Sequence, residues 1–477
     1  MSNQPRTKDE IYQRIRETSK DEYIFEEMVR LGYWNQNKDK PEDPPDEVAR
    51  LMELERQLRS LGTEYSRLKN ENAIRKAFRK KRMLESRQKQ KENKEKRIRE
   101  KEERKKAWQE KKNKDILYLG KNVSFGLNHK ISDLEKLKKN NLPLLNNALE
   151  LAEFFDITVN QLRFLAFHRD VSTTSHYIHF KIPKKSGEFR TICAPKPLIK
   201  SVQTQILHKI LYLVPVNKNA HGFLPEHSIL TNAQSHVAQE IVINLDLKNF
   251  FPSIHFKRIK GVFRSLGYSE SVATILGLIC SSAQTQEIEM DGTTYYVAQG
   301  DRVLPQGAPT SPAITNIICR TLDEQLENAA KRFECEYSRY ADDMTFSSNK
   351  KNLEIGKLFQ QINYLVAKAD FTIHKEKTRI MRKHKKQEVT GIIVNDKPGI
   401  SRRKIRKFKA LLFQIEKDGL KGKRWGNSKD ILKSIKGFAS YVAMVKPELG
   451  EKFLNQVEQI FKKHKKKKKF RLFKRKE

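Results

Sequence analysis

The chain has 477 residues, enough for two or three domains, and its 96 Lys and Arg against 58 Asp and Glu give a formal net charge of +38. So large a positive charge predicts a polyanionic partner, for which nucleic acid fits best; a basic ribosome-associated or membrane-surface protein is the alternative. The four cysteines form no Cys-x-x-Cys pair, which argues against a zinc module and a disulfide framework. The polar N-terminus and the lack of a membrane-spanning apolar run predict a cytoplasmic protein without membrane contact.

The first 114 residues are expected to be helical and separate from the rest. Residues 1–45 hold an amphipathic segment and a proline-rich linker, to which we assign no function. From residue 46, apolar residues recur every three or four positions, which predicts a coiled coil or a helical hairpin: Leu51, Leu54, Leu58, Leu61, Tyr65 and Leu68. Residues 71–114 are too rich in Lys and Arg to bury a face. We interpret residues 46–114 as a coiled-coil and basic helical arm along nucleic-acid phosphates, with a solvated charged helix as the alternative.

Three acidic residues are predicted to meet at strand ends. Asp342 and Asp343 are flanked by aromatic and β-branched residues, which indicates two short strands joined by a turn with the acids at its tip. Asp246 follows the apolar strand 241–245. Carboxylates without a neutralising cation repel each other, and hard divalent cations relieve that repulsion. Two such ions about 4 Å apart are what phosphoryl transfer needs at the attacking and leaving oxygens.

Four further motifs surround these acids in the sequence. Strands at 177–182 and 189–192 flank Lys184 and Lys185 and predict a basic hairpin. Asn232 and His236, four residues apart, share a helix face and could bind RNA or cap a helix. The string 304–312, Leu-Pro-Gln-Gly-Ala-Pro-Thr-Ser-Pro, predicts a loop before a helix at 313–326. Val-Thr-Gly at 389–391 opens a predicted strand that runs to residue 394.

In order and spacing, these motifs resemble those of bacterial retron-type reverse transcriptases over roughly residues 140–460. The resemblance implies an α+β right-hand polymerase, with fingers and palm at 115–400, a helical thumb at 401–461 and a basic tail at 462–477. The motifs at 232–236 and 389–391 distinguish it from group II intron proteins, which remain an alternative. The long charged helical extension before residue 115 departs from the family pattern.

The resemblance also implies roles for single residues. Asp246, Asp342 and Asp343, with the backbone carbonyl of Leu247, would hold two Mg²⁺ ions. The residues that would contact the incoming dNTP are Arg190, Lys184 or Lys185, Gln306, Phe251 beneath the sugar as a steric block to a 2′-hydroxyl, and Lys377 at the pyrophosphate, with Lys375 as its competitor. The residues that would contact RNA are Asn232, His236, Val389, Thr390 and Gly391, and the thumb residues Arg402 and Arg403.

The family's activity implies specific partners. Its members use a cognate structured noncoding RNA as template and primer, make a small RNA-linked single-stranded DNA, and act in antiphage defence with an effector or toxin protein. Three alternatives stay open from the sequence. They are a template-independent or protein-primed defence polymerase of the same fold, a group II intron-like enzyme, and an RNA-binding scaffold that sequesters a toxin.

Overall fold

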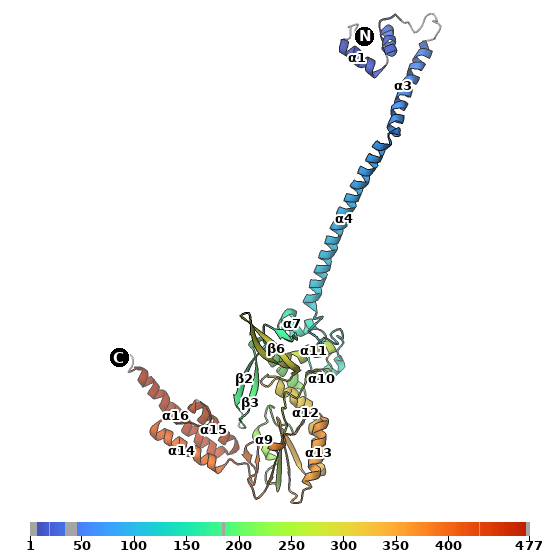
Figure 1. Cartoon of the computed structure of the whole chain (residues 1–477). Helices are drawn as coiled ribbons and strands as arrows, with labels where there is room; N and C mark the ends of the chain where they lie inside the picture. Colours follow the sequence, from blue (N-terminus) through green and yellow to red (C-terminus); the bar gives the residue numbers. More distant parts are fainter. Residues whose placement is uncertain (1–6, 19, 34–44, 184–186, 429, 474–477) are drawn as a thin grey trace. The chain divides into compact units, whose positions relative to one another are not determined.

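The computed structural model describes residues 7–18, 20–33, 45–183, 187–428 and 430–473 (Figure 1). These residues belong to two compact units, Met1–Trp108 and Gln109–Glu477. Residues 34–44, which hold most of the predicted proline-rich linker, lie outside the described residues, as do Lys184, Lys185 and the last four residues of the basic tail. Among the described residues, no helix is both long enough and apolar enough to cross a membrane.

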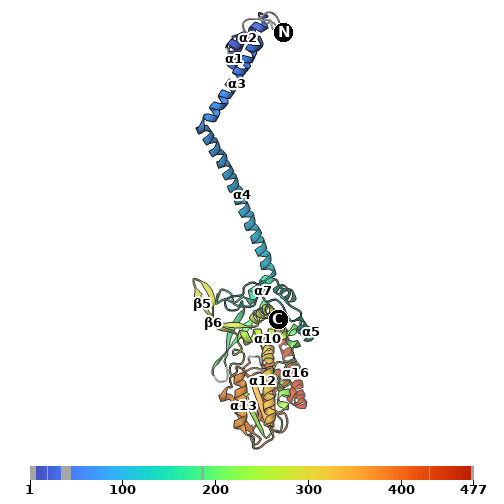
Figure 2. The ribbon, with the colours of Figure 1, turned by 90° about the vertical axis from the view of Figure 1, so that its right-hand side faces the viewer.

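The first unit is helical, as its sequence predicts. The amphipathic segment forms two helices, α1 (Lys8–Glu17) and α2 (Lys20–Arg30). Helix α3 (Pro45–Lys69) carries the apolar stripe and passes through Gly62 without a break, and α4 (Glu71–Lys114) follows after Asn70 (Figure 2). The stripe therefore lies on one uninterrupted helix.

The second unit begins with short helices and the hairpin predicted for the fingers. Helices α5 (Leu134–Lys139), α6 (Ala148–Phe154) and α7 (Val159–Ala166) precede β1 (Val171–Ser172). Strands β2 (Tyr177–Pro183) and β3 (Phe189–Pro195) pair antiparallel, which confirms the predicted hairpin. Helix α8 (Pro197–Lys209) and the 3-10 turn η1 (Leu211–Leu213) follow. A longer hairpin, β5 (Ser282–Met290) with β6 (Thr293–Val303), turns at Asp291 and Gly292, both with positive φ as its two-residue turn requires.

A four-stranded antiparallel sheet forms the centre of the second unit. Its order is β7 (Glu336–Tyr340), β8 (Asp343–Ser348), β4 (Ile241–Asp246) and β9 (Arg379–Arg382). Strand β4 is buried on both faces, because Ile241, Ile243 and Leu245 join one core and Val242 the other. The first core also contains residues of α10 (Phe256–Leu266), α11 (Glu270–Ile279), α12 (Ser311–Arg332) and α13 (Ile355–Lys368). The apolar run of β4 is what places its last residue, Asp246, at a fixed edge of this sheet.

The second core holds the helices predicted as the thumb. These are α14 (Arg402–Asp418), α15 (Ile431–Val445) and α16 (Pro447–Phe473), which pack around Phe408 with rings of Trp425, Phe438 and Phe453. Helix α9 (Ile229–Gln234) and the two-residue strands β10 (Glu388–Val389) and β11 (Ile392–Ile393) contribute to the same core. The basic run at 465–469 continues α16, although such runs are usually unstructured when isolated.

Candidate active site

The three acidic residues meet at one edge of the central sheet. Asp246 and Asp343 are directly opposite each other in the register of β4 and β8. The backbone N–H of Leu247 donates to the carbonyl of Asp342 at 3.0 Å, and the N–H of His374 donates to the carbonyl of Asp246 at 2.7 Å. The hairpin with acids at its tip, predicted from the sequence, is confirmed. Backbone hydrogen bonds on both sides thus fix the positions of these acids.

The charges of the three carboxylates act on one another. Partial burial and the negative charge of Asp246 raise the pKa of Asp342. Partial burial and the charges of Asp342 and Asp246 raise the pKa of Asp343 to about 7. Because the side chain of Asp343 is exposed, the charges of Asp342 and Asp246 contribute more than burial to its raised pKa. An acid that resists ionisation beside two others is a site where a divalent cation would be favoured.

The donor set suits Mg²⁺, although the side chains are not arranged as a finished metal site. Carboxylate oxygens are the ligands that Mg²⁺ prefers, and three of them share this edge. Within the described residues, no three His, Cys, Asp or Glu side chains are grouped so that they could hold a metal ion as they stand. Instead, the ammonium group of Lys377 lies 2.7 Å from Oδ1 of Asp246. Binding of an ion at Asp246 would therefore require Lys377 to move toward another anion.

Lys377, and not Lys375, is the lysine at the acids. Both belong to the 3-10 turn η2 (Lys375–Lys377). Of the two, Lys377 is the one whose ammonium group contacts Asp246 within the described residues. Its side chain is 52% exposed, so it can reach a ligand bound at this edge. The position favours Lys377 as the group that would donate a proton to, or screen, a departing phosphate.

We expect Lys377→Ala to lower the rate of nucleotide addition by about 10²–10⁴-fold, because a positioned proton donor contributes that much. Lys375→Ala is the matched control, since it removes the same charge two residues away, and should stay within about threefold of wild type. Single-turnover primer extension measures both. Equal losses in the two variants would mean that the rate depends on the total positive charge near the acids and not on the position of Lys377.

A buried ion pair holds the turn that carries the acids, and sequence reasoning missed it. Arg339 is fully buried, and its Nη2 lies 2.6 Å from Oδ2 of Asp323 in α12. Its Nη1 donates to the carbonyl of Ala341 at 3.0 Å and to Oδ1 of Asn316 at 3.1 Å. Ala341 has a φ of 57°, a conformation that non-glycine residues rarely adopt. Arg339 therefore stabilises an unfavourable turn directly before Asp342.

A loop from residue 219 to 222 supports the same turn from outside. Arg339 and Ala220 form a parallel bridge, and the amide of Asn316 donates to the carbonyl of Gly222 at 2.8 Å. A Cβ atom on Gly222 would lie 2.5 Å from the backbone nitrogen of Ala341. Only glycine leaves room for this approach.

The residues predicted to contact the nucleotide differ in how they are placed with respect to the acids. Burial and Asp246 raise the pKa of Asp342, and the positive charge of Arg190, on β3 opposite Ile182, opposes that rise, so its guanidinium acts on this acid across space. The carbonyl of Gln306 accepts the N–H of Cys193 at 2.8 Å, and its side chain is half-buried. Gly307 packs against β3, where a Cβ would lie 2.9 Å from the carbonyl oxygen of Cys193. Lys184 lies outside the described residues.

Phe250 and Phe251 differ in how far their side chains are buried. Phe250 is buried and packs on Phe371, with ring centroids 5.5 Å apart. Phe251 is half-buried and stacks near Phe223, whose ring also lies 6.4 Å from that of Tyr340. Phe251 is thus the ring of the pair that remains open beside the acidic turn, and its role as a steric block to a 2′-hydroxyl stays a proposal.

Asn232 and His236 correct an expectation of the sequence analysis. Both are fully buried, and α9 ends at Gln234, so they do not share an exposed helix face. Nδ1 of His236 lies 2.7 Å from Oγ of Ser347, and Nε2 lies 2.7 Å from Oγ of Ser338. The Ser338 hydroxyl in turn donates to Oδ1 of Asn232 at 2.8 Å. These side chains join α9 to β7 and β8, and in this structure neither is exposed for direct contact with RNA.

The burial of His236 predicts a pH-dependent stability. Burial lowers the pKa of His236 to about 3, so the folded protein keeps the ring neutral while the unfolded chain takes up a proton below about pH 6.5. We expect His236→Ala to cost about 2–4 kcal/mol at pH 7.5, because two buried hydroxyls lose their partner. The difference from wild type should shrink at pH 5.5, where wild type alone loses this contribution. Urea unfolding at both pH values measures it.

The matched control is His384→Ala, an exposed histidine in the same unit. It should change the unfolding free energy by less than about 0.5 kcal/mol at either pH. A His236→Ala penalty that stays constant between the two pH values would contradict the assigned cause.

The Val-Thr-Gly motif forms a turn where a continuous strand was predicted. Thr390 and Gly391 both have positive φ and join β10 to β11 as a two-residue hairpin. Val389 is fully buried in the second core, so its side chain does not reach RNA. Thr390 is half-buried and donates to the carbonyl of Ile229 at 3.2 Å, while Gly391 is exposed and its carbonyl accepts the Tyr441 hydroxyl at 3.0 Å. The motif therefore links α9, the sheet and α15.

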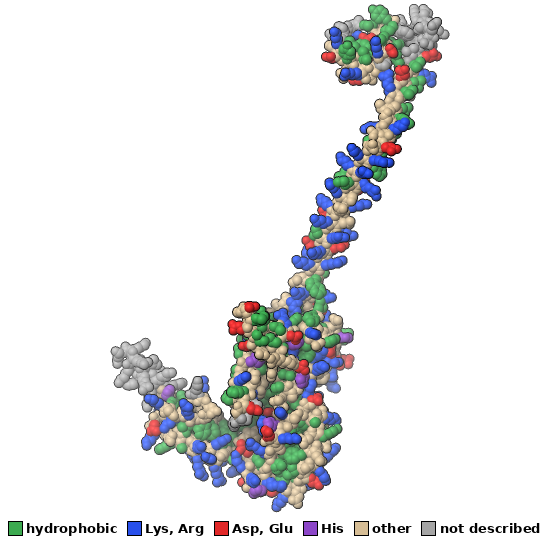
Figure 3. All heavy atoms as spheres, viewed as in Figure 1, with side chains coloured by type: hydrophobic (Ala, Val, Ile, Leu, Met, Phe, Trp, Pro, Cys, Tyr) green, Lys and Arg blue, Asp and Glu red, His purple; other side chains and the backbone are tan. Residues whose placement is uncertain are grey.

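Basic side chains gather along α4 and on α14. Figure 3 shows Lys and Arg along α4 and on α14. The exposed cations of α14 are Arg402, Arg403, Lys404, Arg406, Lys407, Lys409 and Lys417. Duplex phosphates suit such a row, and its contact with RNA or an RNA–DNA duplex stays a proposal.

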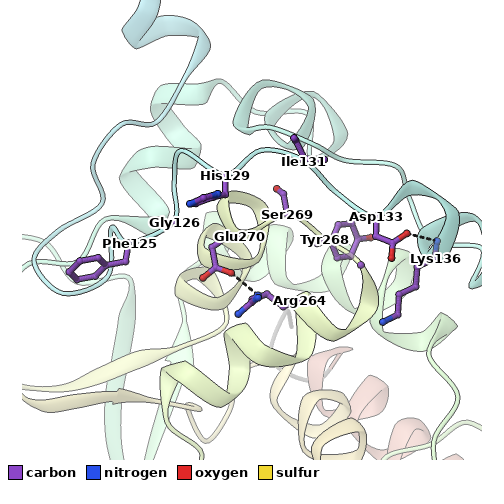
Figure 4. Close-up of a pocket in the computed structure, with 11 residues that line it drawn as sticks. Phe125, Gly126, His129, Ile131, Asp133, Lys136, Arg264, Tyr268, Ser269 and Glu270 are labelled. Atoms are coloured by element: carbon purple, nitrogen blue, oxygen red, sulfur yellow. Dashed lines mark hydrogen bonds and ion pairs between the residues drawn. The ribbon is translucent and has the colours of Figure 1, made fainter.

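A pocket of about 570 Å³ lies elsewhere in the second unit (Figure 4). Its lining comes from the segment before and within α5 and from the end of α10 and the start of α11: Phe125, Gly126, His129, Ile131, Asp133, Lys136, Arg264, Gly267, Tyr268, Ser269 and Glu270. Arg264 and Glu270, at its rim, form an ion pair with 2.6 Å between Nε and Oε2. None of the predicted site residues lines it, so it is distinct from the acidic edge.

Comparisons with known proteins agree with this geometry. Residues 182–394 match the family model described as reverse transcriptase (RNA-dependent DNA polymerase). The retron Mx162 reverse transcriptase of Myxococcus xanthus is 38% identical over 341 residues, which cover 68% of this chain and 69% of the relative. The retron Mx65 enzyme of the same organism is 35% identical, covering 68% and 74%, and the retron Ec86 enzyme of Escherichia coli is 28% identical, covering 69% and 94%.

Among solved structures, a telomerase from Candida tropicalis in complex with a fragment of telomeric RNA overlays with a TM-score of 0.35 and 12% identity. The overlay covers 61% of this chain and 54% of that chain. A likeness of this size carries no argument about function.

Proposed function

Because this chain belongs to the family of retron reverse transcriptases and is an RNA-directed DNA polymerase, we propose that it copies a cognate structured noncoding RNA into RNA-linked single-stranded DNA. The observation that carries the proposal is the meeting of Asp246, Asp342 and Asp343 at one edge of the central sheet. The family uses divalent metal ions, and Asp246, Asp342 and Asp343, with the carbonyl of Leu247, are the groups that would hold two Mg²⁺ ions here. When bound, such ions activate a hydroxyl nucleophile and neutralise charge on the leaving phosphate.

The side chains around the acids have separate tasks in this proposal. Lys377 leaves Asp246 for the pyrophosphate and screens or protonates it. Arg190, with a lysine of the 184–185 pair, neutralises the triphosphate from the fingers side. Gln306 hydrogen-bonds the incoming sugar or base, and Phe251 excludes a 2′-hydroxyl, so that deoxynucleotides are selected.

The RNA is held by surfaces outside the acidic edge. The exposed cations of α14, including Arg402 and Arg403, and those of α4 bind phosphates without reading sequence. Thr390 and Gly391 lie at an open turn between the sheet and α15 and contact the structured part of the template. Val389 supports that turn from the core.

We also propose that the RNA-linked DNA acts in antiphage defence together with an effector protein. The support is the family membership, since the relatives are retron enzymes by name. The chemistry at the acids does not depend on this part of the proposal.

The test is to isolate the nucleic acid that copurifies with the protein expressed from its own locus, with and without RNase treatment. A discrete DNA joined to RNA, absent from the Asp342→Asn/Asp343→Asn variant, is the expected result. Heterogeneous DNA without linked RNA would instead identify a template-independent or protein-primed polymerase. RNA alone, unchanged in the variant, would identify a scaffold whose catalysis is secondary. The site residues would then need a different explanation.

A further inference from the structure

Helix α3 exposes a continuous apolar stripe, which we name the α3 seam. Its side chains are each between 53% and 71% exposed: Leu51, Leu54, Leu58, Leu61, Tyr65 and Leu68. Single exposed apolar residues are ordinary, but six at a and d spacing along one helix form the contact face of a coiled coil. We therefore expect a partner to cover the seam. All six of its residues belong to the first unit.

The helices next to α3 contact a different face of it. Arg56 forms an ion pair with the buried Glu22 of α2, and Nη1 of Arg59 donates to the carbonyl of Thr18 at 3.0 Å. Met52, four residues before Arg56, is half-buried on that side. Figure 2 shows α1 and α2 beside α3. Since positions 52, 56 and 59 are turned away from the a and d positions, α1 and α2 leave the seam open.

The seam is confined to α3. The positions that would continue its spacing are Glu47 before it and Asn72, Arg75 and Arg79 after it, all of them polar. A partner of the seam is therefore expected to match it over the 18 residues from Leu51 to Leu68 and to leave the basic helix α4 free.

The charges beside the seam are complementary to those of a second copy of the chain. We propose that the α3 seam pairs with the α3 seam of a second copy of this chain, parallel and in register. In such a pair, Arg50 of one copy faces Glu55 of the other, and Glu64 faces Lys69, each twice by symmetry. The third pair of flanking positions, Gln57 and Gly62, is neutral, so no like charges meet.

The side chains in the single copy are compatible with this pairing. Glu55 has an i,i+4 contact with Arg59 at 3.6 Å, and both side chains are more than half exposed, so the contact is weak. The ammonium of Lys69 lies 5.1 Å from the ring centroid of Tyr65, which keeps this charge at the edge of the seam. A seam of under three heptads forms a reversible dimer, with a dissociation constant on the order of micromolar.

The first experiment measures the mass of the full-length chain by sedimentation over a concentration series after nuclease treatment, which removes dimers bridged by RNA. We expect the mass to rise from one chain to two. Leu58→Glu/Leu61→Glu should keep the chain monomeric, while Ser66→Glu, a charge added to the same helix outside the seam, should leave the rise unchanged. A chain that is monomeric throughout, or a dimer that survives the leucine changes, would overturn the proposal.

The second experiment tests register and direction by exchanging charges. Glu64→Lys and Lys69→Glu should each weaken the homodimer about tenfold, since like charges then face each other twice. An equimolar mixture of the two variants should recover wild-type affinity, because the exchanged charges are complementary between chains. Leu61→Cys should form an intermolecular disulfide under mild oxidation, which the unsubstituted chain should not do. Failure of the mixture to recover would overturn the parallel in-register arrangement.

Discussion

Replacing Asp342 or Asp343 by asparagine should lower DNA synthesis on an RNA template by at least about 10²–10³-fold, since each change removes an oxygen ligand and a charge at the reacting phosphates. Primer extension with excess Mg²⁺ measures the rate. Asp301→Asn, an 85%-exposed aspartate in β6, is the matched control and should keep wild-type activity. Retention of activity in the Asp343→Asn variant would exclude this acid from the metal site.

The same change should have the opposite effect on stability. The pKa of Asp343 is raised to about 7 in the fold, so its ionised form is disfavoured there, and the folded state loses stability as the pH rises from about 4 to 7. Without divalent ions, Asp343→Asn should therefore be more stable than wild type at pH 8, by on the order of 1 kcal/mol after solvent screening. At pH 5 the difference should nearly vanish. A destabilised variant at pH 8 would show that the loss of activity came from the fold.

Breaking the buried pair Arg339–Asp323 should cost about 3–5 kcal/mol of unfolding free energy, because the remaining charge stays buried without a partner. Asp323→Ala and Arg339→Leu test the two sides in urea unfolding. The surface pair Lys350–Glu334 is the control: its side chains are 50% and 66% exposed, and Lys350→Ala should cost less than about 1 kcal/mol.

The double variant Arg339→Leu/Asp323→Leu separates structure from function. Two apolar side chains of similar volume should recover much of the lost stability. The DNA polymerase rate should remain low, because the carbonyl of Ala341 has lost the donor that holds the acidic turn. Recovery of both properties would mean that Arg339 has a packing role only.

The sequence was informative where local signals and hydrophobic pattern agree. The strand before Asp246 and the hairpin around Asp342 each carry such a signal, and the structure confirms them. The family motifs predicted the order of fingers, palm and thumb. Helix α15 lies within the region 401–461 that was predicted to be helical.

What sequence reasoning missed depends on contacts between distant residues. From sequence alone, a charged residue such as Arg339 is expected to be exposed. Its partner Asp323 lies on another element, so no local sequence signal predicts the pair. Asn232 and His236 also look like surface groups, yet two serines on neighbouring strands satisfy the histidine inside the protein. At 389–391, the apolar residues on both sides suggested one strand, while the Thr-Gly pair makes a turn that only its φ angles reveal.

The close approach of Gly222 to Ala341 limits which residues are tolerated at position 222, although glycine itself carries no functional group. A single methyl group at residue 222 would lie 2.5 Å from a backbone nitrogen of the acidic turn, so even alanine must push that turn aside. The turn cannot yield cheaply, because Arg339 holds it from the other side and its φ is already unfavourable. A scan of all substitutions, scored by DNA synthesis, should thus find residue 222 nearly as intolerant as the acids themselves.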